Sequence, residues 1–432
     1  MLDQTQRELL ETVEAEDVRF IRLSYADLFG QPRNMAIMSS GLKNALLEGV
    51  PTDASKIAGF EDGSDEDLFL VPDSSTASLL PWRPAHDRVM RLLCDIRTHD
   101  GAESVYSTRN LLRSTVEEAV DLGYIINAGA DCEFTLFRMD EQGHPERVPI
   151  DLGSFHDVSP LDKGEDIRRD ICLALEEMGL GPVSSHHEAG HGQNEIDFRC
   201  SDVLSAADDF QTFRMAVKAV SAQHGSYASF MPKPFRDDYG NGLHINLSLL
   251  RGGKNVFQAV PEHSKEGEAF IAGILSHMAE MTAFLNPIPN SYERLGSMGA
   301  PDRIDWGDQR RSFCVRIPAS SPERIRMELR SPDPSCNFYL ALSLIIRAGL
   351  DGIRKGYVLE RQSALKGESS AASLPKTLGE ALDLASESSF IQRNLPESLL
   401  SVWMKWKKRE WKAYREAADG HEHEMTRSFF RL

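Results

Sequence analysis

The chain has 432 residues, a formal net charge of −18 and six scattered cysteines, and these values exclude several classes of protein. The acidic balance and the lack of a basic tract argue against nucleic-acid binding. Because no Cys-x-x-Cys pair occurs, zinc and redox chemistry are disfavoured, and the cysteine usage predicts the reducing cytoplasm. The N-terminus lacks the apolar core of a secretory signal and no apolar run could span a bilayer, so we expect no membrane partner.

The length predicts two domains. Residues 1–103 are expected to form a small α+β unit, with strand-like alternation at 18–23 and 34–38 and a helix over 39–49 between a serine start and a glycine stop. A second helix start follows this unit, so we place the domain boundary there and assign residues 104–432 to a larger α+β domain.

The larger domain mixes helices and strands. Helical periodicity appears over five segments (164–179, 207–223, 264–284, 337–353 and 399–417), and strand-like alternation over five others (131–137, 193–199, 243–249, 312–318 and 325–330). The last helix carries Trp403, Trp406 and Trp411, which predict a core or subunit-interface face, whereas its lysines and arginines predict a solvated face. The serine-rich segment 362–372 is expected to be an exposed loop.

Arg326, Glu328 and Arg330 alternate with the apolar Met327 and Leu329. In a strand, side chains at alternate positions share a face, so the apolar pair can enter a core while the charged row lies opposite. A charged row partly removed from water is unfavourable unless partners or ligands satisfy it. The segment therefore suggests a buried polar site, although a single row is weak evidence.

Two further polar rows occur in strand-like segments, at Asp131 and Glu133 and at His244, Asn246 and Ser248. Either pattern alone is typical of a solvated strand face. A glycine-rich segment between them carries two more acidic residues that could approach each other, Glu188 and Glu195. Five acidic positions and one histidine in the same domain favour convergence on one site.

Carboxylate oxygens with a single imidazole suit hard octahedral cations, Mg²⁺ or Mn²⁺. Five carboxylates exceed the needs of one ion, so two or more ions are expected, and ions held in this way commonly bridge substrate phosphates. His186, His187 and His191 could extend the metal site or make ordinary hydrogen bonds. Neither a P-loop nor a Gly-x-Gly-x-x-Gly motif occurs, so a nucleotide would need another architecture.

Four segments, 233–248, 290–295, 315–318 and 326–334, resemble motifs of the glutamine synthetase family in the right order, and the similarity covers nearly the whole chain. The resemblance implies an α+β fold, with a small N-terminal β-grasp-like domain followed by a catalytic domain with a curved antiparallel sheet and helices. It also implies an ATP-dependent ligase, in which ATP phosphorylates the γ-carboxylate of glutamate and an amine attacks the acyl phosphate.

Carried over by position, the resemblance gives each polar row a role. The first metal ion is assigned to Glu133, Glu188 and Glu195, and the second to Asp131, His244 and Glu328. Glutamate is assigned to Arg294, Arg330 and the Gly240 backbone, together with Glu133 and Glu188. The transferred phosphoryl group is assigned to Arg311 and Arg316, and the nucleotide to Arg326, Asn246 and Ser248.

Two of the family positions differ in this chain without changing the expected reaction type, and a third keeps its residue among changed neighbours. Asp131 stands where glutamate is usual, and Asn246 replaces a usual histidine. Asp53 matches the aspartate of the family's ammonium pocket, but its neighbours have changed, and it could equally cap a helix or turn. A tyrosine that is adenylylated in some bacterial relatives is missing from 367–375, which bears on regulation.

The flap that follows Arg294 differs more sharply. It runs from Gly296 to Pro301, one residue shorter than usual, and Gly299 stands where the family carries a glutamate that helps deprotonate ammonium. This loss favours a primary amine larger than ammonia, such as methylamine, a polyamine or an aromatic monoamine. The alternatives are a glutamine synthetase that uses ammonium, with the flap misaligned here, and a non-catalytic structural or regulatory relative.

The resemblance further implies a homo-oligomer, either a hexameric ring or a dodecamer of two stacked rings, with active sites shared between subunits. Asp53 would then act on the site of the adjacent subunit. The amine itself, the choice between Mg²⁺ and Mn²⁺ and the number of subunits are left open by the sequence.

Overall fold

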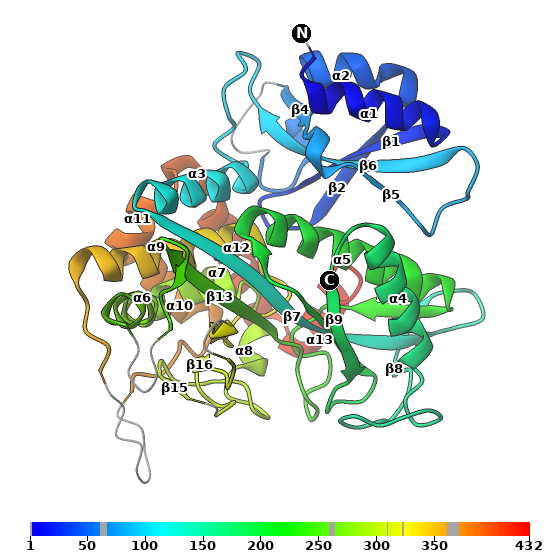
Figure 1. Cartoon of the computed structure of the whole chain (residues 1–432). Helices are drawn as coiled ribbons and strands as arrows, with labels where there is room; N and C mark the ends of the chain where they lie inside the picture. The colour runs from blue at the N-terminus through cyan, green and yellow to red at the C-terminus, as the bar shows by residue number, and fades with distance from the viewer. Residues whose placement is uncertain (1, 61–66, 259–263, 309, 322–323, 361–370) are drawn as a thin grey trace.

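The computed structural model describes residues 2–60, 67–258, 264–308, 310–321, 324–360 and 371–432. A small N-terminal sheet with two helices, drawn in blue to cyan, lies above a larger part that contains a long curved sheet (Figure 1). None of the helices in the described ranges is long and apolar enough to cross a membrane.

The N-terminal sheet has the order β2-β1-β6-β4-β3, with β5 paired to β6. Its central pair, β1 and β6, is parallel, and its other pairs are antiparallel. Its elements are α1 (Gln4–Ala15), β1 (Val18–Ala26), β2 (Pro32–Met38), α2 (Leu42–Glu48), β3 (Val50–Thr52), β4 (Leu68–Pro72), β5 (Ser78–Leu79) and β6 (Arg88–Arg97). The strands expected at 18–23 and 34–38 are both present, and the expected helix over 39–49 is a short 3₁₀ turn followed by α2.

The larger sheet has the order β15-β16-β17-β13-β7-β10-β9. Its strands are β7 (Tyr124–Met139), β8 (Pro145–Pro149), β9 (Pro182–His187), β10 (Gln193–Phe198), β11 (Ser201–Asp202), β12 (Ser226–Ser229), β13 (Leu243–Arg251), β14 (Lys254–Asn255), β15 (Trp306–Asp308), β16 (Val315–Ile317) and β17 (Met327–Leu329). The pairing of β15 with β16 is parallel, while the other described pairs are antiparallel. The sheet expected to be antiparallel is therefore mixed at one edge.

The helices of the larger part pack on this sheet and on each other. They are α3 (Thr108–Asp121), α4 (Glu165–Glu177), α5 (Val203–Gln223), α6 (Lys265–Ser276), α7 (Met278–Leu285), α8 (Ser291–Arg294), α9 (Phe338–Lys355), α10 (Leu378–Glu387), α11 (Ser389–Asn394), α12 (Glu397–Glu416) and α13 (Gly420–Arg427). The domain boundary expected after residue 103 falls in the connection between β6 and α3. The loop expected over 362–372 lies mostly outside the described residues, since 361–370 are not described.

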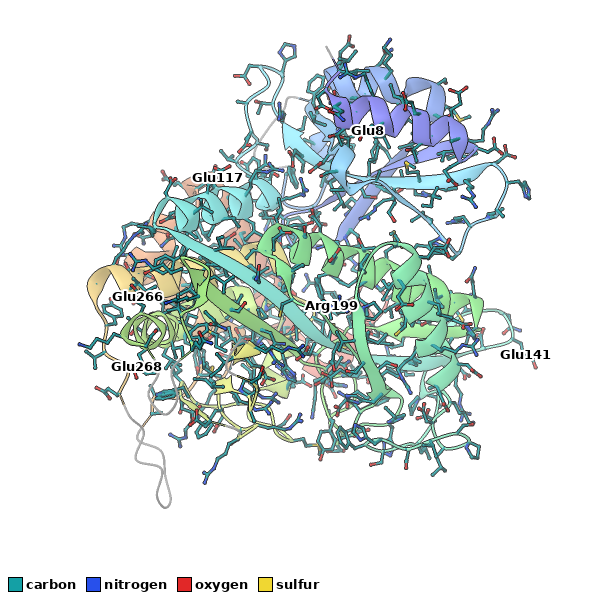
Figure 2. The ribbon with its side chains drawn as sticks, in the orientation of Figure 1. Glu8, Glu117, Glu141, Arg199, Glu266 and Glu268 are labelled. Atoms are coloured by element: carbon teal, nitrogen blue, oxygen red, sulfur yellow. The ribbon has the colours of Figure 1, made fainter. Side chains whose placement is uncertain are left out.

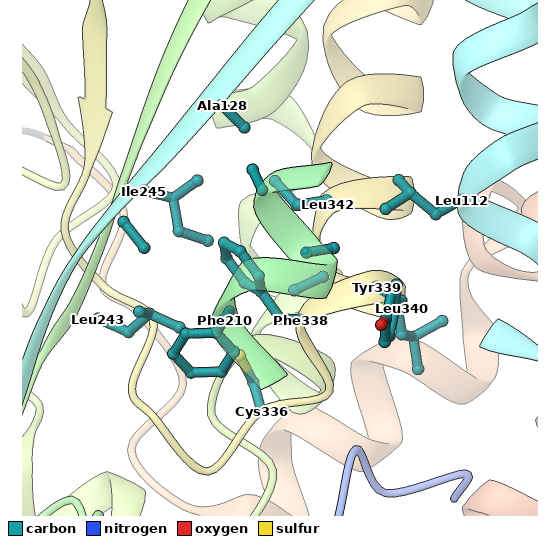
Figure 3. Packing of buried hydrophobic residues seen from close by; sticks show 14 of the residues in the cluster. Leu112, Ala128, Phe210, Leu243, Ile245, Cys336, Phe338, Tyr339, Leu340 and Leu342 are labelled. Atoms are coloured by element: carbon teal, nitrogen blue, oxygen red, sulfur yellow. The ribbon is translucent and has the colours of Figure 1, made fainter. Parts of the chain in front are cut away.

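The main core lies between β7 and β13 on one side and α5 and α9 on the other. Figure 3 shows Ala128 and Ile245 from the strands facing Phe210 and Phe338 from the helices. All four side chains are fully buried or nearly so, and burial of an aromatic or branched side chain contributes about 1.5–3 kcal/mol. This packing fixes β7 and β13, whose opposite faces carry the polar rows.

Two expectations about the helices are wrong in detail. The single helix expected over 264–284 is broken at His277, whose ring stacks on Phe390 and whose two nitrogens contact Glu280 and Asp351. On α12 the charged face is not wholly solvated, because Lys407 is buried and paired with a buried glutamate. The tryptophan face does enter the core, since Trp403 stacks on Phe284 with 4.2 Å between ring centroids.

Most of the net negative charge lies on the surface. Figure 2 shows labelled glutamates at the periphery of the molecule, on α1, α3, α6 and the turn after β7. A solvated carboxylate needs no partner, so this surface charge requires no structural compensation. Buried acidic groups are a different case and mark the places where partners or ligands are needed.

Arg109, at the start of α3, joins the two parts of the molecule. Its buried guanidinium contacts Asp73 at 2.9 Å and Asp95 at 2.6 Å, both in the N-terminal part, and Asp208 on α5 at 2.7 Å. Without the guanidinium, the three carboxylates would repel one another. The orientation of the N-terminal sheet on the larger part therefore depends on this side chain.

We expect Arg109→Ala to destabilise the protein by about 3–5 kcal/mol, because it leaves buried carboxylates without their counter-ion. The midpoint of urea unfolding measures the effect. Arg169→Ala is the matched control, since Arg169 pairs with Asp166 and Asp170 at the surface and its loss should leave the midpoint almost unchanged. A similar midpoint for the two variants would contradict this role for Arg109.

Candidate active site

Strand register brings the polar rows together. β7 is the shared neighbour: Glu133 lies opposite Glu195 of β10, and Asp131 lies opposite both His244 of β13 and Asp197 of β10. On the other side of β13, Asn246 lies opposite Glu328 of β17. Each strand places its polar residues on the face opposite the core. The result is a compact acidic cluster on the curved sheet.

The cluster contains overlapping groups that could hold metal ions. Ligand atoms of Asp131, His244 and Glu328 lie within 4.8 Å of one another, and so do those of Glu133, Glu195 and His244. His244 belongs to both groups and lies 3.8 Å from a carboxylate oxygen of Glu133 and 3.8 Å from one of Glu328. The imidazole therefore stands between two sets of carboxylates.

Glu188 joins the cluster through a third such group, with His186 and Glu195. His186 lies 3.7 Å from Glu188 and 3.6 Å from Glu195, so its ring borders the acidic set. The other two histidines of this segment contact carboxylates outside the cluster, and His187 forms with Asp151 and Asp162 a separate group that could hold an ion. His187 contacts Asp151 at 3.0 Å, and His191 contacts Asp238 at 2.7 Å.

Burial and mutual repulsion perturb the ionisation of the cluster. Burial, reinforced by Asp197, raises the pKa of Asp131 to about 7, and burial with the charge of Glu188 raises the pKa of Glu133 to about 7. The pKa of Glu195 is raised well above its usual value for the same reasons. Burial and nearby arginines lower the pKa of His244 far below its usual value, so the ring is neutral.

The electrostatics fit a cation. Ionised carboxylates packed this closely need positive charge between them, and a neutral imidazole can donate a lone pair to a metal. Carboxylate oxygens with one imidazole are donors that Mg²⁺ and Mn²⁺ accept. The donor set of this site thus matches the hard divalent ions expected from the sequence.

Arginines surround the acidic cluster. Arg330 donates to one oxygen of Glu328 at 2.6 Å, and Arg316 donates to the other at 2.8 Å. Arg326 donates to Asn246 at 2.8 Å, and the Asn246 amide in turn donates to Asp131 at 2.8 Å. Each arginine therefore both holds a cluster residue in place and adds positive charge beside it.

Arg294 is buried and donates to two main-chain carbonyl groups, those of Ser331 at 2.8 Å and Arg330 at 3.2 Å. Neither contact compensates its charge, and burial lowers the pKa of its guanidinium. The turn beside it requires glycine: a Cβ at Gly240 would lie 2.5 Å from the Pro232 carbonyl oxygen. Backbone and guanidinium together could hold a substrate carboxylate.

The flap closes on itself as a tight turn. The Gly296 amide donates to the Pro301 carbonyl at 3.2 Å, and Ser297 accepts a hydrogen bond from the buried Lys233 at 3.1 Å. Gly299 has a φ of +91°, and a Cβ there would meet no atom within 4 Å. Gly299 thus leaves space on its side of the flap tip, beside the exposed side chain of Met298.

Three of the expected site residues stand somewhat apart. Asp53 lies in the N-terminal sheet domain, is fully exposed and caps a 3₁₀ turn by accepting from Ser55; this hydrogen bond lowers its pKa. In the described part of the chain it shares no hydrogen bond or ion pair with the acidic cluster. Arg311 is exposed, although its carbonyl accepts from Arg330 at 2.8 Å. Ser248 is half-buried further along β13.

Sequence reasoning missed Gln193 and Asp197. Gln193 donates to Glu133 at 2.9 Å and to the Gly240 carbonyl at 3.1 Å, so it ties a cluster carboxylate to the glycine turn. Asp197 extends the acidic set beside Asp131 and Glu195. Strand alternation was the available signal, because positions 193, 195 and 197 share one face.

Comparisons with known proteins agree with this geometry. A family model described as "Glutamine synthetase, catalytic domain" matches residues 105–426, and one described as "Glutamine synthetase, beta-Grasp domain" matches residues 17–99. The chain belongs to the glutamine synthetase family. The expected fold, a β-grasp domain followed by a catalytic domain with a curved sheet, is therefore confirmed. Enzymes of this family are ATP-dependent ligases of nitrogen metabolism that use divalent metal ions and are typically oligomeric.

Curated relatives match almost end to end. The glutamine synthetase of Methanosarcina mazei is 40% identical over 98% of this chain and 97% of its own, and that of Clostridium saccharobutylicum is 38% identical over 96% and 97%. Among solved structures, a complex of a protein named GmaS with ADP has a TM-score of 0.86 and 28% identity, covering 97% of this chain and 98% of its own. The structure of GmaS without ligand has a TM-score of 0.86 and 29% sequence identity, and the match covers 99% of both chains.

The raised pKa values predict how pH and metal act together. The carboxyls of Asp131 and Glu133 keep their protons in the folded chain up to about pH 7, whereas in the unfolded chain they lose them near pH 4. Their contribution to stability is therefore complete below about pH 4 and is lost as pH rises through about 7. Mg²⁺ binds the ionised form and should reverse that loss.

We therefore expect saturating Mg²⁺ to raise the melting temperature much more at about pH 8 than at about pH 5. Differential scanning calorimetry measures the increment. Glu328→Gln should reduce it at the higher pH, whereas Asp166→Asn, an exposed carboxylate on α4, should preserve it. An increment that does not change with pH would show that the cluster binds metal without releasing protons.

Proposed function

We propose that the protein joins the γ-carboxylate of L-glutamate to a primary amine larger than ammonia, with ATP as the energy source, and is thus a γ-glutamylamide ligase. The observation that carries the proposal is the flap, which has no acidic side chain between Gly296 and Pro301 and an open tip at Gly299. A compact ammonium ion needs a carboxylate to bind and deprotonate it, whereas a substituted amine needs space for carbon.

The arrangement of the cluster supports phosphoryl transfer to glutamate. Two or more Mg²⁺ or Mn²⁺ ions would be held by Glu133, Glu188 and Glu195 and by Asp131, His244 and Glu328. When bound, such ions neutralise phosphate charge and orient the phosphoryl group. Arg294, Arg330 and the Gly240 backbone would hold glutamate, whose γ-carboxylate oxygen attacks the terminal phosphorus of ATP while ADP leaves.

The remaining arginines would lie beside the phosphate oxygens, on which negative charge develops during phosphoryl transfer. Arg316 and Arg311 would contact the transferred phosphoryl oxygens, and Arg326 with Asn246 and Ser248 would border the nucleotide. Preformed donors of this kind stabilise a transition state because they need no reorganisation. The neutral amine nitrogen then attacks the acyl carbon, phosphate leaves and one proton is lost from the nitrogen. An amine that arrives as a cation must first give up another proton.

Asp53 supplies the candidate acceptor for that proton. It is exposed on the N-terminal domain, residues 1–103 by our assignment, away from the cluster held by residues 104–432. We propose that it serves the site of an adjacent subunit in a ring of six, or in two stacked rings. The hydrogen bond from Ser55 keeps it ionised and therefore able to bind a cationic amine.

The name of two structural neighbours supports the larger amine, since GmaS is a γ-glutamylmethylamide synthetase. A second candidate, glutamine synthetase activity with ammonium, is favoured by the curated relatives, which carry that name at up to 40% identity among those compared here. A non-catalytic role is disfavoured because the acidic set and the arginines are all retained. The flap is the feature that supports the first candidate over the second.

We expect methylamine or a bulkier primary amine to give a kcat/KM at least about 10-fold above that of ammonium, because the flap lacks the carboxylate that ammonium needs. Coupled ADP release with ATP, glutamate, Mg²⁺ and a panel of amines measures this ratio. Glu328→Gln should lower turnover at least about 100-fold with every amine. If ammonium is the best substrate, the protein is a glutamine synthetase; if no amine supports ADP release, it is not a ligase.

A carboxylate placed on the flap should shift the preference toward ammonium. Because the φ of Gly299 is +91°, any side chain there strains the backbone by about 1–2 kcal/mol, so Gly299→Ala serves as the control for Gly299→Glu. Relative to the alanine variant, we expect the glutamate variant to raise the ammonium-to-methylamine ratio of kcat/KM about 10-fold. Equal ratios in the two variants would mean that the flap does not select the amine.

A further inference from the structure

A large cavity lies away from the acidic cluster, between the N-terminal domain and the C-terminal segment. Its volume is about 670 Å³, within the roughly 300–1,000 Å³ typical of small-molecule sites. Its walls are the loop after β1, residues 55–58, Lys218 on α5, part of α12 and residues 427–432. None of the residues in the acidic cluster lines it. We call this space the C-terminal cavity.

The walls of the C-terminal cavity are strongly basic, although the chain as a whole has a charge of −18. Two carboxylates, Asp27 and Glu410, face six cationic side chains, which are Arg33, Lys56, Lys218, Lys407, Arg427 and Arg431. Both carboxylates are already paired. Asp27 contacts Arg33 at 2.8 Å, and Glu410 contacts Lys407 at 2.9 Å and Arg427 at 2.7 Å.

Lys56, Lys218 and Arg431 therefore line the cavity with no ion pair to any residue that the structure describes. Of the three, Lys218 lies in the environment that is least favourable to a positive charge. Its ammonium donates to the Arg431 carbonyl at 3.0 Å, which satisfies a hydrogen bond but neutralises no charge. Burial and repulsion from Arg214 lower the pKa of Lys218 to about 7. An ammonium held this way is stabilised by an anion.

Two aromatic side chains also line the cavity. Phe29 and Trp406 lie with ring centroids 5.4 Å apart, and the indole N–H of Trp406 is buried without a hydrogen-bond partner among the described residues. The cavity thus combines an apolar surface, an unsatisfied donor and three cationic side chains that form no ion pair with a described residue. Sites that bind organic acids combine the same elements, a mostly apolar wall and a few placed charges.

We propose that the C-terminal cavity binds a small organic anion with two or more carboxylate or phosphate groups. One such molecule supplies the negative charge that Lys56, Lys218 and Arg431 lack, while its carbon skeleton lies against Phe29 and Trp406. This site is separate from the acidic cluster, whose buried carboxylates repel anions in the absence of metal. Binding to the cavity therefore does not depend on which amine the enzyme uses.

Isothermal titration calorimetry of the full chain, freed of divalent ions, tests the proposal with citrate and pyrophosphate as probes. We expect at least one to bind, and Lys218→Met combined with Lys56→Gln to weaken that binding at least about 10-fold. Lys408→Gln is the matched control, because Lys408 is exposed on α12 and does not line the cavity. Preference for citrate or for pyrophosphate distinguishes a carboxylate ligand from a phosphate ligand.

Failure of both probes to bind the unaltered chain would overturn the proposal, and so would unchanged affinity in the double variant. Arg431→Gln, at an exposed position, covers the case in which loss of the buried Lys218 prevents folding, and it should also weaken binding. Unchanged affinity in this variant would count against the site as well. A thermal melt like that of the unaltered chain shows that each variant is folded, a control that does not depend on catalysis because Lys56 lies in the turn capped by Asp53.

Discussion

The repulsion among carboxylates buried around one imidazole is the constraint on which the rest of the molecule depends. Asp131, Glu133 and Glu195 would not ionise together in this setting without added positive charge. The surrounding arginines supply part of this positive charge and hold Glu328 and Asn246 in position. Divalent cations are suited to supply the rest of the charge. The pairing of strands in the curved sheet holds these like charges close together, at a distance suited to shared counter-ions.

Much of this arrangement could be predicted from the sequence, because strand alternation is a strong local signal. The row Arg326, Glu328 and Arg330 shares a face for a simple geometric reason, and Met327 and Leu329 are completely buried as that reason requires. The family resemblance then assigned the separate rows to one site. Periodicity alone could not do so, since it says which residues share a face but not which strand lies beside which.

Other features depend on tertiary contacts that leave no local trace. The break at His277 comes from its partners Asp351 and Phe390, which are distant in sequence. Lys407 occupies a position that periodicity assigns to solvent, yet it is buried against Glu410 and lies 5.2 Å from the ring centroid of Phe29. Gln193 was overlooked because an amide in an acidic row carries no charge. In each case a partner distant in sequence contributes, namely Asp351 and Phe390 for His277, Phe29 for Lys407 and Glu133 for Gln193.

The conformation of Gly299 has a consequence for how this branch of the family can change over evolutionary time. A left-handed backbone at the tip of a shortened flap accepts glycine readily and other residues only with strain. A single substitution therefore cannot restore the missing acid without cost, whereas an insertion that lengthens the turn could. Under the proposed function, a return to ammonium use by substitution alone would strain the turn, whereas a longer turn could carry the acid without that strain.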